Sequence, residues 1–206
     1  MTLDALERPA DGEPAGTLVL LHGRGADERD LYPLLDLFDP ERRLRGLTPG
    51  GPFALPPGGR HWYRLAGIPT PDPDTFWPSF KQLADLVDGL QKPLVLGGFS
   101  QGAVMSYALA LGRSRELRPA ALMPLSGFIP SVDGLELDLT GLEGFPVAIA
   151  HGTLDEVIPV DYSRAARDAL TAAGANVAYH EARLGHTIDP AIVPALRDFV
   201  ARSIGL

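Results

Sequence analysis

Ser100 has the surroundings of a serine nucleophile. It lies between Gly98 and Gly102 in a G-x-S-x-G motif, after an apolar run at residues 93–96 and before a stretch with helical spacing of apolar residues. A strand, this motif and a helix are typical of the nucleophile elbow, a strained turn that lifts the serine hydroxyl above the edge of a sheet. The turn needs small flanking residues. The alternative is a glycine-rich turn whose serine is incidental.

A serine hydroxyl needs a general base, and His186 is the strongest candidate among the five histidines. It lies in a turn between a predicted strand and the predicted last helix, from which a loop can reach over a sheet edge to Ser100. His180 lies inside the strand pattern. His22 and His151 each precede a glycine in a turn, and we interpret them as structural residues that bond to the backbone.

A carboxylate should hold the imidazole in the correct tautomer and stabilise its charged form. Asp155 lies in a turn that follows a buried apolar run. The chain order Ser100, Asp155, His186 is that of the α/β-hydrolase fold, and each residue follows a separate predicted strand. Glu156 and Asp189 are the alternative acids, and a solvated turn aspartate is the alternative interpretation of Asp155.

Attack on a carbonyl creates an oxyanion, which preorganised N–H donors must stabilise. One donor is expected at the residue after the nucleophile, Gln101, and the other in the loop after the first core strand. That loop contains His-Gly-Arg-Gly at residues 22–25. Because the glycines allow close approach of the backbone, the N–H of Arg24 is the predicted second donor. The alternative is that these residues form only a tight turn.

The composition narrows the class of protein. A length of 206 residues predicts one domain, residues 1–206, with a substantial core. A hydrophobic content of 45% and a charged content of 21% are typical of soluble globular proteins. A net charge of −8 without a Lys/Arg cluster argues against a nucleic-acid partner. The absence of cysteine excludes disulfides, thiolate metal sites and a cysteine nucleophile.

The N-terminal residues have no basic region followed by an apolar run, so no signal peptide is predicted. The longest apolar runs are too short to span a membrane. These features predict a cytoplasmic protein. No metal or cofactor is implied, and the oligomeric state stays open, a homodimer included.

Strands alternate with helices along almost the whole chain. The predicted strands are near residues 2–6, 17–21, 44–47, 93–96, 120–125, 146–150 and 176–181. The predicted helices run from a cap at Asp27 to about Leu37, over 80–90, from Gln101 onward, over 160–173 and over 190–204. This alternation predicts an α/β fold with a mainly parallel central sheet and helices on both faces. Ligands of such sheets bind beyond the carboxyl ends of the strands, where all the candidate residues lie.

Residues 61–63 and 67–74 are predicted to form an ordered loop, and the aromatic residues Trp62, Tyr63, Phe76 and Trp77 bracket the proline-rich stretch over residues 68–78. Aromatic residues this dense in a loop are unusual, because an exposed loop gains little from them. Two interpretations are open. The rings either anchor the loop to the body of the protein or wall an apolar acyl groove beside Ser100 and bind the substrate.

Four segments of the sequence resemble the phospholipase/carboxylesterase family, which includes the acyl-protein thioesterases and small bacterial carboxylesterases. They are residues 21–27 (LHGRGAD), 97–102 (GGFSQG), 151–159 (HGTLDEVIP) and 185–188 (GHTI). The resemblance runs from about residue 17 to the end of the chain. It implies an α/β-hydrolase fold without a large separate cap, and hydrolysis of carboxylic esters or thioesters.

The resemblance also implies roles for single residues. It assigns Ser100, Asp155 and His186 to the catalytic triad, and the N–H groups of Arg24 and Gln101 to the oxyanion hole. The predicted function is a serine hydrolase that cleaves small-molecule carboxylic esters through an acyl-enzyme. An acyl-thioesterase, a lysophospholipase or a peptidase with the same triad is the alternative, and a catalytically silent binding protein is a second one. The loop over residues 48–79 departs most from the family, which leaves substrate choice open.

Overall fold

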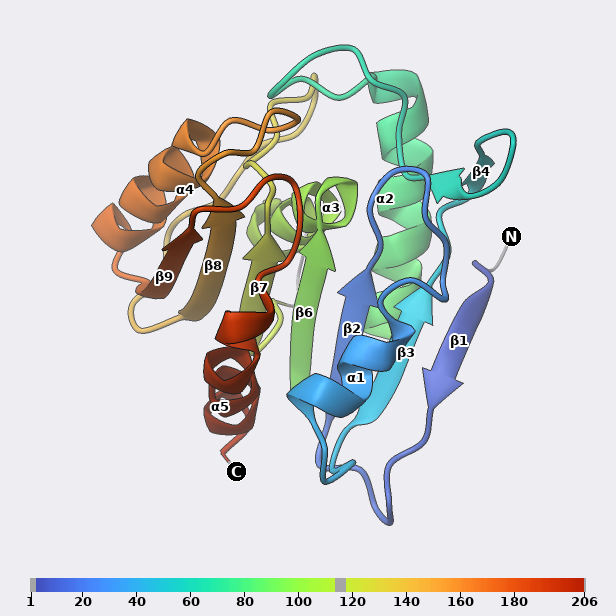
Figure 1. Ribbon diagram of the computed structural model, residues 1–206, viewed down its shortest axis with the longest axis vertical. Coiled ribbons are helices and arrows are strands. Elements are labelled where there is room, and N and C mark those ends of the chain that lie inside the picture. The colour runs from blue at the N-terminus through green and yellow to red at the C-terminus, as the bar shows by residue number, and fades with distance from the viewer. Residues whose placement is uncertain (1–2, 114–117, 206) are drawn as a thin grey trace.

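The computed structural model describes residues 3–113 and 118–205, and a seven-stranded sheet forms its centre. The strands of this sheet are β1 (Ala5–Arg8), β2 (Thr17–Leu21), β3 (Arg45–Pro49), β6 (Leu94–Phe99), β7 (Ala121–Leu125), β8 (Pro146–Gly152) and β9 (Asn176–Ala182). They are ordered β1-β3-β2-β6-β7-β8-β9, and all pairs are parallel except β1 with β3. The carboxyl ends of the parallel strands therefore meet at one edge, the upper edge in Figure 1. A short hairpin of β4 (Phe53–Ala54) and β5 (Arg60–His61) lies outside this sheet.

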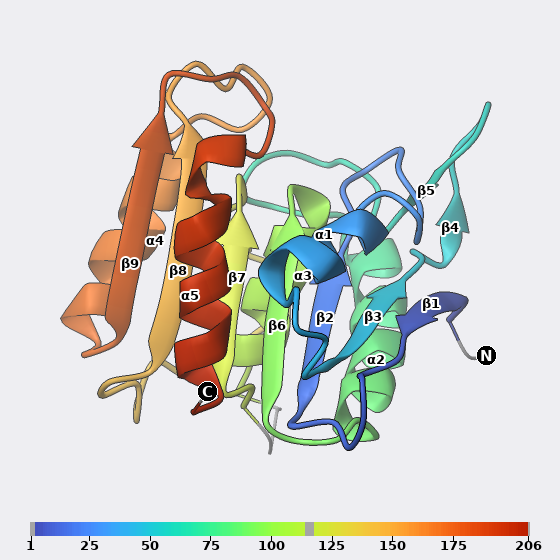
Figure 2. The same ribbon diagram turned by 60° about the horizontal axis from the view of Figure 1, so that its bottom comes forward.

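Helices cover both faces of the sheet. They are α1 (Tyr32–Phe38), α2 (Pro73–Asp88), α3 (Gln101–Leu111), α4 (Asp161–Ala172) and α5 (Val193–Ser203), with a 3₁₀ turn at Pro190–Ile192 before α5. Helices α1 and α5 pack on one face, and α2, α3 and α4 on the other (Figures 1 and 2). The predicted α/β-hydrolase architecture is confirmed, and the described residues include no cap domain. None of the described helices has the length and apolar character needed to cross a bilayer.

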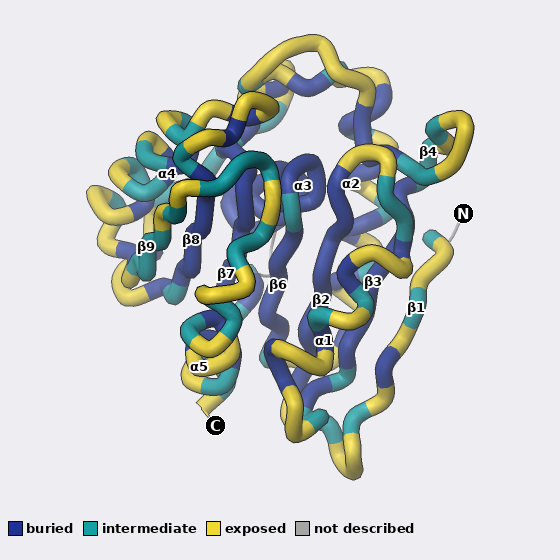
Figure 3. Tube along the Cα trace, viewed as in Figure 1, coloured by how far each residue is buried: buried dark blue, intermediate teal, exposed yellow. Residues whose placement is uncertain are grey.

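The strand sequences follow from this two-sided burial. All five residues of β2 are buried, and their side chains alternate between two cores. Leu18 and Leu20 pack with α1 and α5, whereas Val19 and Leu21 pack with α2 and α3. Figure 3 shows the same burial along β6, β7 and β8. A strand covered on both faces is apolar at every position, which is the pattern that identified these strands in the sequence.

The first helix begins later than predicted. Asp27 does not cap it, because the Asp27 carboxylate accepts a hydrogen bond from the Arg29 N–H at 2.8 Å and closes a local turn. Helix α1 begins at Tyr32. The first strand is observed at Ala5–Arg8 rather than near residues 2–6, and Thr2 lies outside the described residues.

The second helix begins earlier than predicted, at Pro73 instead of residue 80. Its cap is Asp72, whose carboxylate accepts from the Thr75 N–H at 3.0 Å. Proline is well tolerated in the first turn of a helix, since its missing N–H has no partner there. Part of the proline-rich stretch is therefore helical, and Trp77 lies on a helix rather than in a loop.

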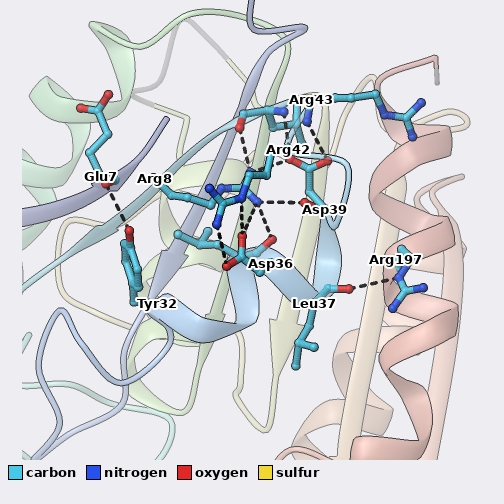
Figure 4. A network of polar contacts seen from close by, with 11 residues as sticks. Glu7, Arg8, Tyr32, Asp36, Leu37, Asp39, Arg42, Arg43 and Arg197 are labelled. Atoms are coloured by element: carbon cyan, nitrogen blue, oxygen red, sulfur yellow. Dashed lines mark hydrogen bonds and ion pairs between the residues drawn. The ribbon is translucent and has the colours of Figure 1, made fainter. Parts of the chain in front are cut away.

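A buried arginine fixes the edge strand to the helix layer (Figure 4). Arg8 of β1 is 1% exposed, and its guanidinium donates to the carbonyls of Leu35 and Asp39 at 3.0 and 2.9 Å and pairs with the Asp39 carboxylate. Both carbonyls also accept a backbone N–H, from Asp39 and Arg42 at 3.0 Å each, so Arg8 adds a second donor to each at the end of α1. Arg197 of α5 donates to the carbonyl of Leu37 at 3.1 Å and joins the two helices of this face.

Candidate active site

Ser100 occupies a strained turn between β6 and α3. Its backbone has φ 54° and ψ −119°, a region that non-glycine residues rarely adopt. The neighbouring strand holds the turn, because the Ser100 N–H donates to the carbonyl of Leu125 at 2.9 Å. The turn places the serine at the N-terminal end of α3, whose first N–H groups have no partner within the helix.

The glycines of the motif are required by contact distances. A Cβ at Gly98 would lie 2.5 Å from the carbonyl of Gly102, and a Cβ at Gly102 would lie 1.9 Å from the carbonyl oxygen of Leu21. A Cβ at Gly23 would lie 3.3 Å from the Cβ of Ser100. The loop after β2 and the first turn of α3 therefore pack against each other at backbone distance.

The structure brings Ser100, His186 and Asp155 together in one chain of hydrogen bonds. The Nε2 of His186 lies 2.8 Å from the Oγ of Ser100, and its Nδ1 lies 2.6 Å from Oδ2 of Asp155. The imidazole packs against the ring of Phe99 with centroids 4.8 Å apart. Among the described residues, neither Glu156 nor Asp189 contacts His186.

Two loops at the upper edge of the sheet meet to place the acid beside the base. The N–H of Leu154 donates to the carbonyl of Leu184 at 2.9 Å, and the N–H of Thr153 donates to the carbonyl of Ala182 at 2.8 Å. A Cβ at Gly152 would lie 2.3 Å from the carbonyl oxygen of Leu184. The glycine after His151 therefore permits backbone contact between the two loops.

Asp155 is held as a carboxylate by three donors. Its Oδ1 accepts from the N–H groups of Val157 and Ile158, both at 2.9 Å, and its Oδ2 faces His186 and, at 3.2 Å, the Nε2 of His151. Burial raises the pKa of Asp155, but the bonds from His186 and from the two backbone N–H groups outweigh it and leave the pKa below its usual value. The acid is therefore ionised when a base beside it has to accept a proton.

His22 and His151 bond to the backbone, as predicted. The Nδ1 of His22 donates to the carbonyl of Gly23 at 2.7 Å, and its Nε2 accepts from the Gly51 N–H at 2.9 Å. The Nε2 of His151 donates to the carbonyl of Ile158 at 2.8 Å. Burial lowers the pKa of both imidazoles, so both are neutral at pH 7. Neither imidazole hydrogen-bonds to Ser100.

The predicted oxyanion donors lie beside the serine. Arg24 and Gln101 both line the cavity that contains Ser100. Within residues 3–113 and 118–205, neither of their backbone N–H groups donates to a protein acceptor. Two unpartnered N–H groups next to a serine hydroxyl can receive the oxygen of a bound carbonyl.

A cavity of about 410 Å³ opens at Ser100, and its walls are mainly apolar. The residues that line it together with Ser100 and His186 are Arg24, Tyr63, Leu65, Gly67, Ile68, Gln101, Phe128, Val157 and Ile158. Apart from Arg24, Tyr63 and Gln101, none of these was predicted as a site residue. They belong to loops that follow the carboxyl ends of strands or to the proline-rich segment, and an apolar residue in such a loop is the signal that could have identified them.

The segment over residues 65–69 forms the outer wall of this cavity through Leu65, Gly67 and Ile68, and it arches over the sheet edge in Figure 1. The Tyr162 hydroxyl of α4 donates to the carbonyl of Ile68 at 3.1 Å, and the Ser131 N–H donates to the carbonyl of Pro69 at 2.8 Å. These bonds hold the segment in place from two other elements.

The aromatic residues divide between the two interpretations. Tyr63 lines the cavity, but Trp62 and Trp77 do not. Trp62 is fully buried and its Nε1 donates to the carbonyl of His22 at 2.8 Å, while the Nε1 of Trp77 donates to the carbonyl of Asp133 at 3.0 Å. Both tryptophans anchor segments that are distant in the chain, and their assignment to substrate binding stays a prediction.

The side chain of Gln101 fixes the segment that presents Tyr63. Its Oε1 accepts from the Trp62 N–H at 3.1 Å, and its Nε2 donates to the carbonyl of Tyr63 at 2.8 Å. One residue of the elbow thus offers its backbone N–H to the cavity and holds the cavity wall with its side chain. Among the described residues, no group of three or more His, Cys, Asp or Glu side chains could hold a metal ion.

The chain is similar to known proteins over most of its length. A family model described as Phospholipase/Carboxylesterase matches residues 5–204. Acyl-protein thioesterase 1 of Yarrowia lipolytica is 30% identical over 183 residues, which are 80% of this chain and 80% of that protein.

Solved structures share the whole fold. The esterase PE8 superposes with a TM-score of 0.79 at 26% identity, covering 98% of this chain and 99% of the other. The carboxylesterase of Bacillus cereus gives a TM-score of 0.81 at 24% identity, covering 98% and 94%. Acyl-protein thioesterase 2 of Zea mays superposes with a TM-score of 0.80 at 21% identity, covering 98% of this chain and 99% of the other.

Proposed function

The chain belongs to the phospholipase/carboxylesterase family of hydrolases, and from this premise we propose that it is a serine esterase that cleaves carboxylic esters of small molecules. The observation that carries the proposal is the chain of hydrogen bonds from Ser100 through His186 to Asp155, with distances of 2.8 and 2.6 Å. A base in contact with the hydroxyl and a carboxylate on the far side of the imidazole are what an activated serine requires.

In the proposed mechanism the Oγ of Ser100 attacks the ester carbonyl while the Nε2 of His186 takes the hydroxyl proton. The carbonyl oxygen becomes an anion, which the N–H groups of Arg24 and Gln101 stabilise. Asp155 holds the imidazole with Nδ1 protonated and stabilises the imidazolium. His186 then gives its proton to the departing alkoxide, and the acyl group stays on Ser100 as an ester.

A water molecule completes the cycle. His186 removes a proton from the water, the resulting hydroxide attacks the acyl-enzyme, and the same oxyanion donors stabilise the second tetrahedral intermediate. Collapse of this intermediate returns the proton to Ser100 and releases the acid. The apolar walls of the cavity, which include Leu65, Ile68 and Phe128, accept the acyl chain.

An acyl-thioesterase is the second candidate, and the 30% identity with acyl-protein thioesterase 1 of Yarrowia lipolytica favours it. The same residues would cleave a thioester, whose thiolate leaves without needing the proton from His186. The two candidates differ in the leaving group that the cavity accepts, so only a comparison of substrates distinguishes them.

The test is a fluorophosphonate probe combined with a substrate panel. The probe should label the wild-type protein and leave Ser100→Ala unlabelled, because only an activated serine reacts. The panel consists of 4-nitrophenyl esters and acyl-thioesters of matched chain length. Absence of labelling, or labelling that persists in Ser100→Ala, would refute the proposed nucleophile.

A further inference from the structure

Arg24 lines the cavity, and among the described residues its guanidinium has no ion-pair partner. Of the eleven lining residues, only Arg24 and His186 carry basic side chains, and none is a carboxylate. We propose that the Arg24 guanidinium is a binding subsite for an anionic group, so that preferred substrates are esters carrying a carboxylate or a phosphate close to the scissile bond. This inference rests on the ester hydrolysis proposed above and specifies its substrate class.

The neighbouring carboxylates are already engaged by other arginines. Asp27 pairs with Arg29 at 2.9 Å, and Glu28 lies 3.5 Å from Arg60. Among the residues that the structure describes, no Asp or Glu lies within 4 Å of the Arg24 guanidinium, and the side chain is exposed. The charge of Arg24 is therefore available to a ligand without breaking an existing ion pair.

The apolar mouth of the cavity and the net charge of the protein both make the positive charge of Arg24 important for binding an anion. Leu65 and Val157 line the cavity although they are 62% and 58% exposed, so apolar side chains reach its mouth. The protein as a whole carries a net charge of −8, which repels anions. An anionic ester is therefore favoured only where a local cation offsets that field, and in this cavity the cation is Arg24.

The position of Arg24 also fixes where the anion would lie in the substrate. Its backbone N–H is a proposed oxyanion donor, so its side chain starts beside the reacting carbonyl. The guanidinium can then meet a group that lies within the length of one arginine side chain of that carbonyl, and its planar fork matches a carboxylate or a phosphate. The apolar part of the substrate lies along Leu65, Ile68 and Phe128.

The experiment uses matched pairs of esters that differ in one charge. Methyl 4-acetoxybenzoate and 4-acetoxybenzoate place the charge on the leaving group, and 4-acetoxyphenyl phosphate tests phosphate at that position. The methyl ester of 4-nitrophenyl glutarate and the free 4-nitrophenyl hydrogen glutarate place the charge on the acyl group. Wild type, Arg24→Gln and Arg64→Gln are compared by the ratio of kcat/KM for the charged and the neutral member of each pair.

The ratio isolates the side chain of Arg24. Any effect of the substitution on the N–H of residue 24 falls on both members of a pair and cancels. Arg64 is the matched control, because it is exposed and lies between Tyr63 and Leu65 but does not line the cavity. We expect the ratio to fall about three- to tenfold in Arg24→Gln for at least one pair, through KM, and to stay constant in Arg64→Gln. Added salt should reduce the wild-type ratio.

Two results would overturn the subsite. An unchanged ratio in Arg24→Gln would mean that the guanidinium does not contact the anionic group. An equal fall of the ratio in Arg64→Gln would mean that any nearby positive charge has the same effect. Failure of the ester hydrolysis itself has a different signature. In that case the neutral members would not be hydrolysed in a manner that depends on Ser100.

Discussion

Replacing Asp155 with asparagine should remove the base from the serine while leaving the fold in place. The carboxylate accepts from three donors, two backbone N–H groups at Oδ1 and the imidazole of His186 at Oδ2. An asparagine can accept on only one side. Its NH₂ group must face either the N–H groups of Val157 and Ile158 or the imidazoles of His151 and His186.

The orientation of the asparagine amide follows from the number of N–H donors that its NH₂ group would face. Turning the NH₂ toward the backbone would break two hydrogen bonds, at about 1 kcal/mol each or more for buried groups. Turning it toward the histidines breaks no fixed bond, because the Nε2–H of His151 donates to the carbonyl of Ile158 and the imidazole of His186 can change tautomer and accept at Nδ1. The second orientation is therefore favoured. It leaves the proton of His186 on Nε2, where it points at Ser100 and cannot take the serine proton.

The expected loss of kcat is about four orders of magnitude, the size seen when the same tautomer error is imposed on a serine protease. The assay is steady-state hydrolysis of 4-nitrophenyl acetate, with far-UV circular dichroism and a melting curve to establish folding. Glu156→Gln is the matched control, since Glu156 is the exposed neighbour of Asp155 in the same turn and should keep its activity. If Asp155→Asn retained more than about one-tenth of wild-type kcat, or if Glu156→Gln lost as much, the assignment of the acid would be wrong.

Three further outcomes follow from the contacts. Gly102→Ala should unfold or strongly destabilise the protein in urea titration, by more than about 4 kcal/mol, because its Cβ would lie 1.9 Å from the carbonyl oxygen of Leu21. Trp62→Ala should lower the free energy of unfolding by about 3–5 kcal/mol without changing the order of preference among acyl chain lengths, since the buried ring does not line the cavity; a changed order would return it to the groove. Arg164 holds the pKa of Glu181 at about 2, below its usual 4.5, so this pair stabilises the fold above pH 4.5 and ceases to do so as the pH falls to about 2. The difference in melting temperature between wild type and Glu181→Gln should therefore shrink over that range, and a constant difference would contradict it.

The chain itself specified the fold class and the motifs of the site, because these depend on local pattern. Strands such as β2 and β6 are buried on both faces, so their apolar runs are visible without coordinates. The G-x-S-x-G motif and the His-Gly pair at residues 151–152 mark places where a Cβ would meet backbone atoms. Such places tolerate only glycine, and they could be located from the sequence alone.

The secondary structure predicted from local pattern was wrong where prolines lie within a helix. Residues 73–79 include two prolines, which suggested a loop, yet Asp72 caps a helix there and Pro73 occupies a position that needs no N–H. Whether such a stretch is helical depends on what packs against it, since α2 buries Phe76 and Phe80 in the core.

Only the tertiary structure decided the walls and the charge of the cavity. Whether Trp62 faces substrate or core depends on His22, forty residues earlier in the chain, whose carbonyl accepts its N–H. Whether Arg24 is paired depends on Arg29 and Arg60, which engage the nearby carboxylates. A cavity forms from side chains that meet across several loops, and their directions are set by packing between residues far apart in sequence, which no local pattern contains.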